Sequence, residues 1–130
     1  MKLQKILSNF QKLHPKEIDL SLDRIQNLCK KLGNPQDKIR ALSVVGTNGK
    51  NSTIQAIYAI LKEANIKCNV YTSPHIQKIN ERFVFNNQEL NDEELADLLE
   101  EVEKINDNEP ITVFEMLSAC FFYKAAQYPD

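Results

Sequence analysis

The chain has 130 residues, of which 42% are apolar and 26% are charged, and its formal net charge at pH 7 is −2. This composition is ordinary for one globular domain with a substantial core, and it excludes disordered, collagen-like and low-complexity classes. The balance of 16 basic and 18 acidic residues gives no basic surface for non-specific nucleic-acid binding, so we expect no nucleic-acid partner.

The first two predicted elements are amphipathic helices. Apolar residues recur at helical spacing through residues 3–14, which predicts a helix there. His14 and Pro15 end it, because proline cannot extend a helix and biases the preceding residue towards extended backbone. A second helix is predicted between Ser21, placed to cap its start, and Gly33, just past its end.

The middle of the chain has the pattern of a strand, a glycine turn, a helix and a second strand. Residues 41–45 form a short apolar run of strand length that meets Gly46 directly. Helical spacing returns over residues 51–64, and residues 67–71 resemble another strand. This order predicts a βαβ unit, in which the two strands are parallel and the crossover is right-handed.

The following segment predicts a turn and then a helix with a strong start signal. Residues 82–85 alternate weakly between apolar and polar and end at two asparagines, residues 86–87, which favour a turn. Apolar residues at helical spacing predict a helix over residues 92–105. Asn91 and Glu94 are spaced as a capping box, and the acidic first turn suits the helix dipole.

A last helix is predicted from about residue 112 to residue 127. The sequence contains no internal repeat and no linker-like stretch, so we expect residues 1–130 to belong to one domain. The predicted class is α/β, with a parallel sheet of P-loop type flanked by helices. Because such a fold would next supply a strand, we expect this sequence to be truncated.

Several absences narrow the class further. No apolar run approaches the roughly 20 residues of a membrane span, and the N-terminus lacks the apolar region of a signal peptide, so we expect no membrane partner. Cys29, Cys68 and Cys120 are far apart in apolar segments, which favours three reduced thiols in a cytoplasmic protein. His14 and His75 are not spaced as a metal-binding pair.

The turn between the first predicted strand and the helix after it has the residues that phosphate binding requires. Gly46 and Gly49 allow backbone N–H groups to point inward, and the helix N-terminus adds unpaired donors and partial positive charge. Lys50 can neutralise the outer phosphates, and a hydroxyl from Ser52 or Thr53 can reach Mg²⁺.

This turn departs from the common P-loop pattern at two positions. Val44 stands where that pattern has glycine, and Asn51 stands where it has serine or threonine. On local sequence alone, a tight strand-to-helix turn with a solvated lysine is therefore the alternative interpretation.

The segment Gly46-Thr-Asn-Gly-Lys50 resembles the ATP-binding loop of the Mur ligase superfamily. Further stretches in the same order resemble one branch of it, the folylpolyglutamate synthase/dihydrofolate synthase family. These stretches are Ile18-Asp-Leu-Ser-Leu-Asp-Arg-Ile25, Tyr71-Thr-Ser-Pro-His75, Asn80-Glu-Arg82 and Thr112-Val-Phe-Glu-Met-Leu117. Together the motifs cover nearly the whole chain.

The resemblance implies specific roles for individual residues. ATP would be bound by Gly46, Thr47, Asn48, Gly49, Lys50, Asn51 and Ser52. The Mg²⁺ ligands would be Ser73 and the loop hydroxyl, for which we choose Ser52. The pterin-substrate site would be lined by Ile18, Asp19, Leu20 and Thr112.

The resemblance also predicts what this chain lacks. The family usually has glycine where this chain has Asn51, although other Mur-type ligases carry a side chain there. The family's further metal ligands, an acidic residue and a later histidine, would lie beyond Asp130. The domain that helps to bind glutamate would lie there too. We therefore expect residues 1–130 to be the N-terminal part of the ATP-binding ligase domain, without the C-terminal domain.

Some of these residues also have structural interpretations. Ser73 and Pro74 are typical of a turn, and Asp19 could act only at a helix start. Thr112 and Glu115 are spaced as a capping box, which does not exclude contact between Thr112 and a substrate. His75 is interpreted as a loop residue rather than a catalytic base.

The implied function is ATP-dependent amide ligation with ATP and Mg²⁺ as cofactors. The substrates would be L-glutamate and a pteroate or folate, either dihydropteroate or tetrahydrofolate, and the enzyme would be a cytoplasmic monomer when full length. Lys50 is the predicted catalytic residue. Two alternatives stay open: a Mur-type ligase for another carboxylate, and a non-catalytic nucleotide-binding module for these residues alone.

Overall fold

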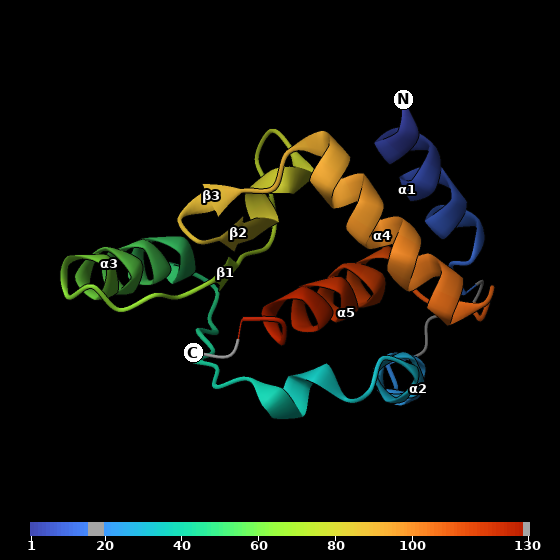
Figure 1. Ribbon diagram of the computed structural model, residues 1–130, viewed down its shortest axis with the longest axis horizontal. Helices are drawn as coiled ribbons and strands as arrows, with labels where there is room; N and C mark the ends of the chain where they lie inside the picture. Colours follow the sequence, from blue (N-terminus) through green and yellow to red (C-terminus); the bar gives the residue numbers. More distant parts are fainter. Residues whose placement is uncertain (16–19, 129–130) are drawn as a thin grey trace. The chain divides into compact units, whose positions relative to one another are not determined.

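The computed structural model describes residues 1–15 and 20–128. The chain divides into two compact units (Figure 1). One unit comprises the described residues of 1–39 together with residues 91–128, and the other comprises residues 40–90. Each unit is described by itself below.

The unit formed by the two ends of the chain is helical. Its elements are α1 (Lys2–Lys12), α2 (Asp23–Lys31), the 3₁₀ helix η1 (Pro35–Lys38), α4 (Asp92–Asn106) and α5 (Val113–Ala125). Helix α5 packs against α1, α2, α4 and η1, and α1 also packs against α4 (Figure 1). The four α-helices in this unit confirm the predictions made from apolar periodicity.

The core of this unit consists of the apolar faces that the helical spacing predicted. The apolar side chains in this unit with at most 2% of their surface exposed are Phe10, Leu28, Pro35, Leu95, Ala96, Leu99, Val102, Ile111, Met116, Leu117, Ala119 and Cys120. Burial of one large apolar side chain contributes about 1.5–3 kcal/mol, an upper estimate because the unfolded chain is already partly compact. The core therefore lies where α1, α2 and α4 meet α5.

The helix ends in this unit follow the predicted capping signals in part. The Asn91 side chain accepts from the Glu94 N–H at 2.8 Å, and the Glu94 carboxylate accepts from the Asn91 N–H at 3.3 Å, so this capping box is confirmed. At α2 the N-cap is Leu22, although the predicted cap Ser21 accepts from the Asp23 N–H at 3.4 Å. Gly33 follows the end of α2 with φ +85°, as expected for a helix-terminating glycine.

The unit of residues 40–90 combines one helix with a small sheet. It contains α3 (Lys50–Glu63), β1 (Val70–Tyr71), the 3₁₀ helix η2 (Ile79–Arg82), β2 (Phe83–Phe85) and β3 (Gln88–Glu89). The strands are antiparallel in the order β1-β2-β3, and Val84 lies opposite both Val70 and Glu89. Residues 86–87 form the predicted turn between β2 and β3, with φ values of +51° and +65°.

The parallel pairing predicted for residues 41–45 and 67–71 is not formed in the described residues. Residues 41–45 carry no strand assignment, and β1 pairs with β2 in the antiparallel sense instead. Parallel strands are usually buried on both faces. Here Leu42 is 74% exposed and Val45 is 87% exposed, and α3 buries none of its side chains. Nothing in this unit covers the faces that a parallel pair would need to bury.

Two further sequence expectations concern membranes and thiols. No helix among residues 1–15 and 20–128 combines the length and apolar character that crossing a bilayer requires. All three cysteines carry free thiols, with Cys29 and Cys120 buried and Cys68 half-buried. Burial raises the pKa of each of these thiols above its ordinary value.

Candidate functional site

The predicted phosphate-binding turn is built on two glycines with positive φ. Gly46 has φ +150° and Gly49 has φ +75°, values that residues with a side chain rarely adopt. A Cβ atom on Gly46 would lie 3.9 Å from the Asn48 carbonyl oxygen, and one on Gly49 would meet nothing within 4 Å. Backbone conformation, rather than crowding, is therefore what calls for glycine at position 49.

Helix α3 begins directly after this turn, with Gly49 as its N-cap. The Thr53 N–H donates to the Gly49 carbonyl at 3.0 Å, which is the first helical bond. In the described part of the chain, the N–H groups of residues 47–52 donate no hydrogen bond. Helix N-termini carry unpaired donors and partial positive charge, so these N–H groups are available to an anion.

Lys50 adds a positive charge to the same turn. Its Cγ lies 3.9 Å from the position that a Cβ on Gly46 would occupy, so the side chain runs along the turn. The residue is half-buried, and among the described residues its ammonium group forms no ion pair. Thr47, Asn48 and Ser52 are exposed. Free N–H groups, an unpaired lysine and exposed hydroxyls fit a triphosphate.

Ser73, the predicted metal ligand, lies in a loop of the same unit. It is half-buried, and its peptide bond to Pro74 is cis, in keeping with the predicted turn. The Glu81 carboxylate organises the next part of the loop, because it accepts from the N–H groups of residues 76, 77 and 78 at 3.0, 2.9 and 2.9 Å. These bonds, that from Ile76 first, hold the pKa of Glu81 below its ordinary value.

A second contact holds the other side of this loop. Arg82 Nε donates to His75 Nδ1 at 2.9 Å. His75 is thus engaged as a loop residue, in line with the sequence interpretation. Sequence reasoning gave Glu81 and Arg82 no role of their own, although both stand in the Asn80-Glu-Arg82 motif. The sequence feature that could have indicated these contacts is a carboxylate and a guanidinium a few residues after a serine-proline turn.

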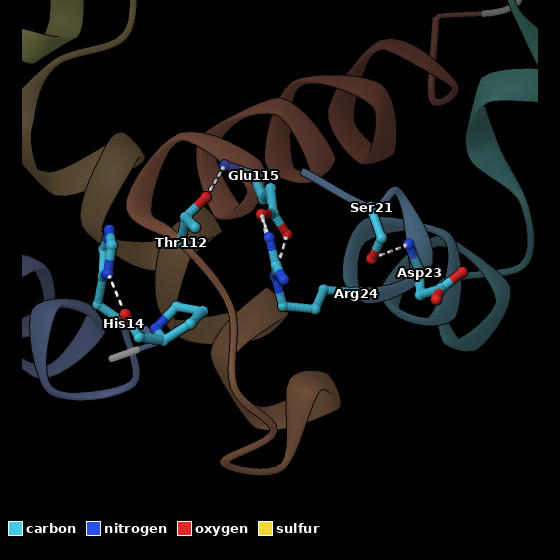
Figure 2. A network of polar contacts seen from close by, with 7 residues as sticks. His14, Ser21, Asp23, Arg24, Thr112 and Glu115 are labelled. Carbon is cyan, nitrogen blue, oxygen red and sulfur yellow. Dashed lines mark hydrogen bonds and ion pairs between the residues drawn. The ribbon is translucent and has the colours of Figure 1, made fainter. Parts of the chain in front are cut away.

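The residues predicted to bind the pterin substrate lie in the unit formed by the chain ends. Ile18 and Asp19 fall outside the described residues. Leu20 is 91% exposed just before α2. Thr112 is the N-cap of α5, and its hydroxyl accepts from the Glu115 N–H at 3.1 Å (Figure 2).

An ion pair that the sequence did not predict joins these two segments. Arg24 on α2 and Glu115 on α5 approach to 2.7 Å, and their side chains are only 14% and 15% exposed (Figure 2). Only one of the two hydrogen bonds of the predicted capping box at Thr112 is therefore formed, because the Glu115 carboxylate accepts from Arg24 instead of from the Thr112 N–H. The Ile111 N–H also donates to the Leu13 carbonyl at 3.1 Å, which joins the end of α1 to the segment before α5.

No family model matches the chain. The chain is 39% identical over 113 residues to the dihydrofolate synthase/folylpolyglutamate synthase of Bacillus subtilis (strain 168), an alignment that covers 82% of this chain and 26% of that protein.

Solved structures agree with this sequence match. A bifunctional folylpolyglutamate synthase/dihydrofolate synthase from Yersinia pestis, complexed with AMPPNP and Mn ion, superposes with a TM-score of 0.87 at 28% identity, covering 97% of this chain and 31% of that one. FolC of Escherichia coli, in complex with DHPP and ADP, gives 0.86 at 32% identity, covering 97% and 30%. The chain thus spans between a quarter and a third of the length of these proteins. The superposition confirms the predicted α/β fold class.

Proposed function

We propose that this chain belongs to the folylpolyglutamate synthase/dihydrofolate synthase family. On that premise, it is part of an ATP-dependent ligase that joins L-glutamate to the carboxylate of a pteroate or folate. In this proposal residues 1–130 are the N-terminal part of the ATP-binding ligase domain. The observation that carries it is the turn at residues 46–52, where the N–H groups and Lys50, at the start of α3, have no partner among the described residues.

The reaction has two steps. A carboxylate is a poor electrophile, so one oxygen of the pteroate or folate carboxylate first attacks the γ-phosphorus of ATP, which forms an acyl phosphate and releases ADP. The amine of L-glutamate then attacks the acyl carbon. Inorganic phosphate leaves from the tetrahedral intermediate, the amine loses a proton, and an amide remains.

The turn would act in the first step by placement and by charge. The N–H groups of residues 47–52 would hold the phosphate oxygens, and Thr47, Asn48, Asn51 and Ser52 would add polar side chains around them. Lys50 would stabilise negative charge that grows on the transferring phosphoryl group, which is why we assign it the catalytic role.

The hydroxyls of Ser52 and Ser73 would help to hold Mg²⁺. Hydroxyl and phosphate oxygens suit this cation, and no group of three acidic, histidine or cysteine side chains gathers as a metal site in the described residues. Bound Mg²⁺ would neutralise charge on the β- and γ-phosphates. The loop contacts of Glu81 would then keep Ser73 in position, as would the Arg82–His75 contact.

The substrate side would involve Ile18, Asp19, Leu20 and Thr112, as the family motifs imply. The exposed position of Leu20 and the N-cap position of Thr112, next to the first turn of α5, support this assignment. Dihydropteroate and tetrahydrofolate are the two candidate acceptors. The structure of the E. coli protein with DHPP and ADP supports a pterin acceptor alongside a nucleotide.

The test uses the complete encoded protein and its Lys50→Ala variant. Calorimetry should detect binding of ATP–Mg²⁺ to the unaltered protein, and phosphate release should require ATP, glutamate and either dihydropteroate or tetrahydrofolate. Because loss of one such stabilising group costs on the order of 10²–10³ in kcat, we expect the variant to lose turnover while it keeps its thermal unfolding profile.

Three results would contradict parts of this proposal. Retained turnover in Lys50→Ala would refute the role of Lys50. Turnover with another carboxylate and none with the pterins would favour a different Mur-type ligase. Binding of ATP without turnover on any carboxylate would leave a nucleotide-binding module.

The proposal includes a cytoplasmic location and a monomeric state. Three free thiols support a reducing compartment. Size-exclusion chromatography of the complete protein at micromolar concentration, together with cell fractionation, tests both statements.

A further inference from the structure

A groove between α1 and α4, in the unit formed by the chain ends, is lined mainly by charged side chains that the proposed function does not use. Its volume is about 570 Å³, within the range of about 300–1,000 Å³ that small-molecule sites occupy. We propose that this groove binds a small zwitterion with a primary ammonium group and a carboxylate, which is the chemical class of free amino acids. None of its lining residues belongs to the proposed ATP, Mg²⁺ or pterin sites, so the inference does not rest on the ligase activity.

The lining carries both signs of charge in equal number. Its charged residues are Lys2, Lys5, Lys104, Glu100, Glu103 and Asp107. A ligand with one sign of charge would meet like charges in the groove as well as opposite ones, and like charges brought together are repulsive. A zwitterion can place each of its charges opposite a complementary one. Asn9 and Asn108 add amide groups that can both donate to such a ligand and accept from it.

Part of this lining is already neutralised from within. Lys2 Nζ lies 2.7 Å from Asp97 Oδ1 and 2.8 Å from Glu100 Oε2. Lys104 Nζ lies 3.7 Å from Glu100 Oε1. The part of the groove around Lys2 and Glu100 is therefore less available to a charged ligand.

Lys5 and Glu103 are charges that remain for a ligand. Among residues 1–15 and 20–128, neither the Lys5 ammonium nor the Glu103 carboxylate has an ion-pair or hydrogen-bond partner. Glu103 is half-buried, and burial, together with the nearby Glu100 carboxylate, raises the pKa of Glu103 above its ordinary value. A carboxylate that is partly removed from water and has no counter-charge gains from an ammonium ligand.

The C-terminal ends of α1 and α4 lie at the same end of the groove (Figure 1). The Leu13 carbonyl, directly after α1, accepts from the N–H of Ile111, in the segment after α4, at 3.1 Å. Helix C-termini carry partial negative charge, which favours a cation. Lys31 already interacts with this end of α4, because its ammonium group donates to the Asn106 carbonyl at 3.3 Å. The ammonium group of a ligand is favoured at this end for the same reason.

These features predict the orientation and the affinity of the zwitterion. Its ammonium group would lie near Glu103 and Asp107, and its carboxylate would lie near Lys5. Because the groove is open to solvent and exposed charge pairs contribute little, we expect a Kd on the order of 1 mM. Loss of the half-buried Glu103 charge should raise this Kd about tenfold, as expected for a hydrogen bond to a charged group. Loss of the exposed Lys5 charge should raise it about two- to fivefold.

The experiment follows the methyl NMR signal of Ile6, whose side chain lines the groove, in the complete encoded protein. The probes are 4-aminobutyrate, putrescine and succinate, which share a four-carbon chain and differ in the charges at its two ends. We expect 4-aminobutyrate to shift the Ile6 signal saturably. The diamine and the diacid, at equal ionic strength, should not saturate it at the same concentrations. Ile60, an exposed residue of the other unit, supplies the control signal, which should not move.

Two variants test the two charges, Glu103→Gln and Lys5→Met. The controls are Glu93→Gln and Lys12→Met, which make the same chemical changes at exposed positions of α4 and α1 outside the groove. The controls should leave the Kd for 4-aminobutyrate unchanged. Thermal unfolding shows whether each variant folds, and if one does not, the comparison of the three probes on the unaltered protein still decides the question.

The inference is overturned if 4-aminobutyrate fails to move the Ile6 signal saturably. It is also overturned if putrescine or succinate binds as tightly as 4-aminobutyrate, because the groove would then select one sign of charge rather than a zwitterion. A folded Glu103→Gln variant with an unchanged Kd would have the same consequence, since the ammonium partner would then not be Glu103.

Discussion

Replacement of Gly49 by alanine tests whether the left-handed turn before α3 forms the phosphate site. Gly49 has φ +75°, and a Cβ there would meet no atom within 4 Å, so the substitution adds strain without crowding. A left-handed conformation costs a residue with a side chain about 1–2 kcal/mol. The smaller entropy of the unfolded alanine chain offsets about 0.4–1 kcal/mol of this, which leaves a net loss of about 1 kcal/mol.

The variant can respond to this strain in two ways. If the turn keeps its shape, the free energy of unfolding falls by about 1 kcal/mol. If the turn relaxes instead, the N–H groups of residues 47–52 lose their alignment, and ATP binding must restore it. Since 1.4 kcal/mol corresponds to a factor of ten, the Kd for ATP–Mg²⁺ should then rise about five- to tenfold.

Gly33→Ala is a matched control within the same chain. Gly33 has φ +85°, and a Cβ there would meet only the Lys38 ammonium nitrogen, at 3.9 Å. The backbone strain is thus comparable, but Gly33 follows α2 in the other unit. We expect Gly33→Ala to lower stability by about as much and to leave ATP affinity unchanged.

Calorimetry with ATP–Mg²⁺ and urea unfolding of both variants, made in the complete encoded protein, distinguish these cases. An equal loss of ATP affinity in the two variants would show that it follows general destabilisation. Unchanged affinity and unchanged stability in Gly49→Ala would show that the turn does not need its left-handed residue. Either result would refute the reasoning about this turn.

Two further predictions concern the loop after Ser73 and the helical core. Three backbone N–H groups lower the pKa of Glu81, so its carboxylate stabilises the fold above its ordinary pKa, and this contribution is lost as the pH falls through the lowered value. NMR should show the amide signals of residues 76–78 shifting together below about pH 4.5. Signals that do not depend on pH, or the same titration in Glu81→Gln, would contradict this prediction. Phe10 is fully buried, so Phe10→Ala should lower the free energy of unfolding by about 3–5 kcal/mol. The control Phe114→Ala changes a side chain that is 53% exposed and should lower the free energy of unfolding by less than about 1 kcal/mol. Equal losses of the two variants in urea unfolding would contradict the assignment of the core.

The helices could be predicted because their signals are local. Apolar residues recur every three to four positions in α1, α2, α4 and α5, and the caps at Asn91 and Thr112 stand at the expected starts. The left-handed turn at residues 86–87 could be predicted too, because asparagine tolerates positive φ better than most residues. In each case the determining residues are within a few positions of one another.

Strand pairing could not be predicted in the same way, because partners are chosen between distant segments. The order of elements around α3 favoured a parallel pair, but Val70 and Tyr71 pair with Val84 and Phe83 in an antiparallel hairpin arrangement. The apolar run at residues 41–45 has strand composition without a pairing partner in the described residues. Composition indicates that a segment can be a strand, and only the tertiary structure decides which strand it joins.

The candidate site shows the same division between local and tertiary information. The turn at Gly46 and Gly49 and the charge of Lys50 could be predicted from sequence, because they depend on local residues, and their binding of phosphate stays a prediction. The partners of Glu81 and Glu115 could not, since a carboxylate accepts from whichever donor the fold brings near. At Glu115 the local capping signal was present, but an arginine 91 residues away in the chain is the partner of its carboxylate.

Within residues 40–90, helix α3, which would carry the proposed phosphate site, has little support from packing. Helix α3 has 14 residues and buries none of their side chains, and isolated helices of about this length are marginal in water. Among residues 1–15 and 20–128 its first N–H groups have no partner, so a bound phosphate would supply hydrogen bonds and a favourable charge at the end where the helix lacks both. Any ligand that binds only the folded form stabilises that form, so nucleotide binding and the order of α3 are thermodynamically linked. In the proposed site, Gly49 and Lys50 would therefore bear on both properties: a change that weakens phosphate binding would also remove a source of order for the helix.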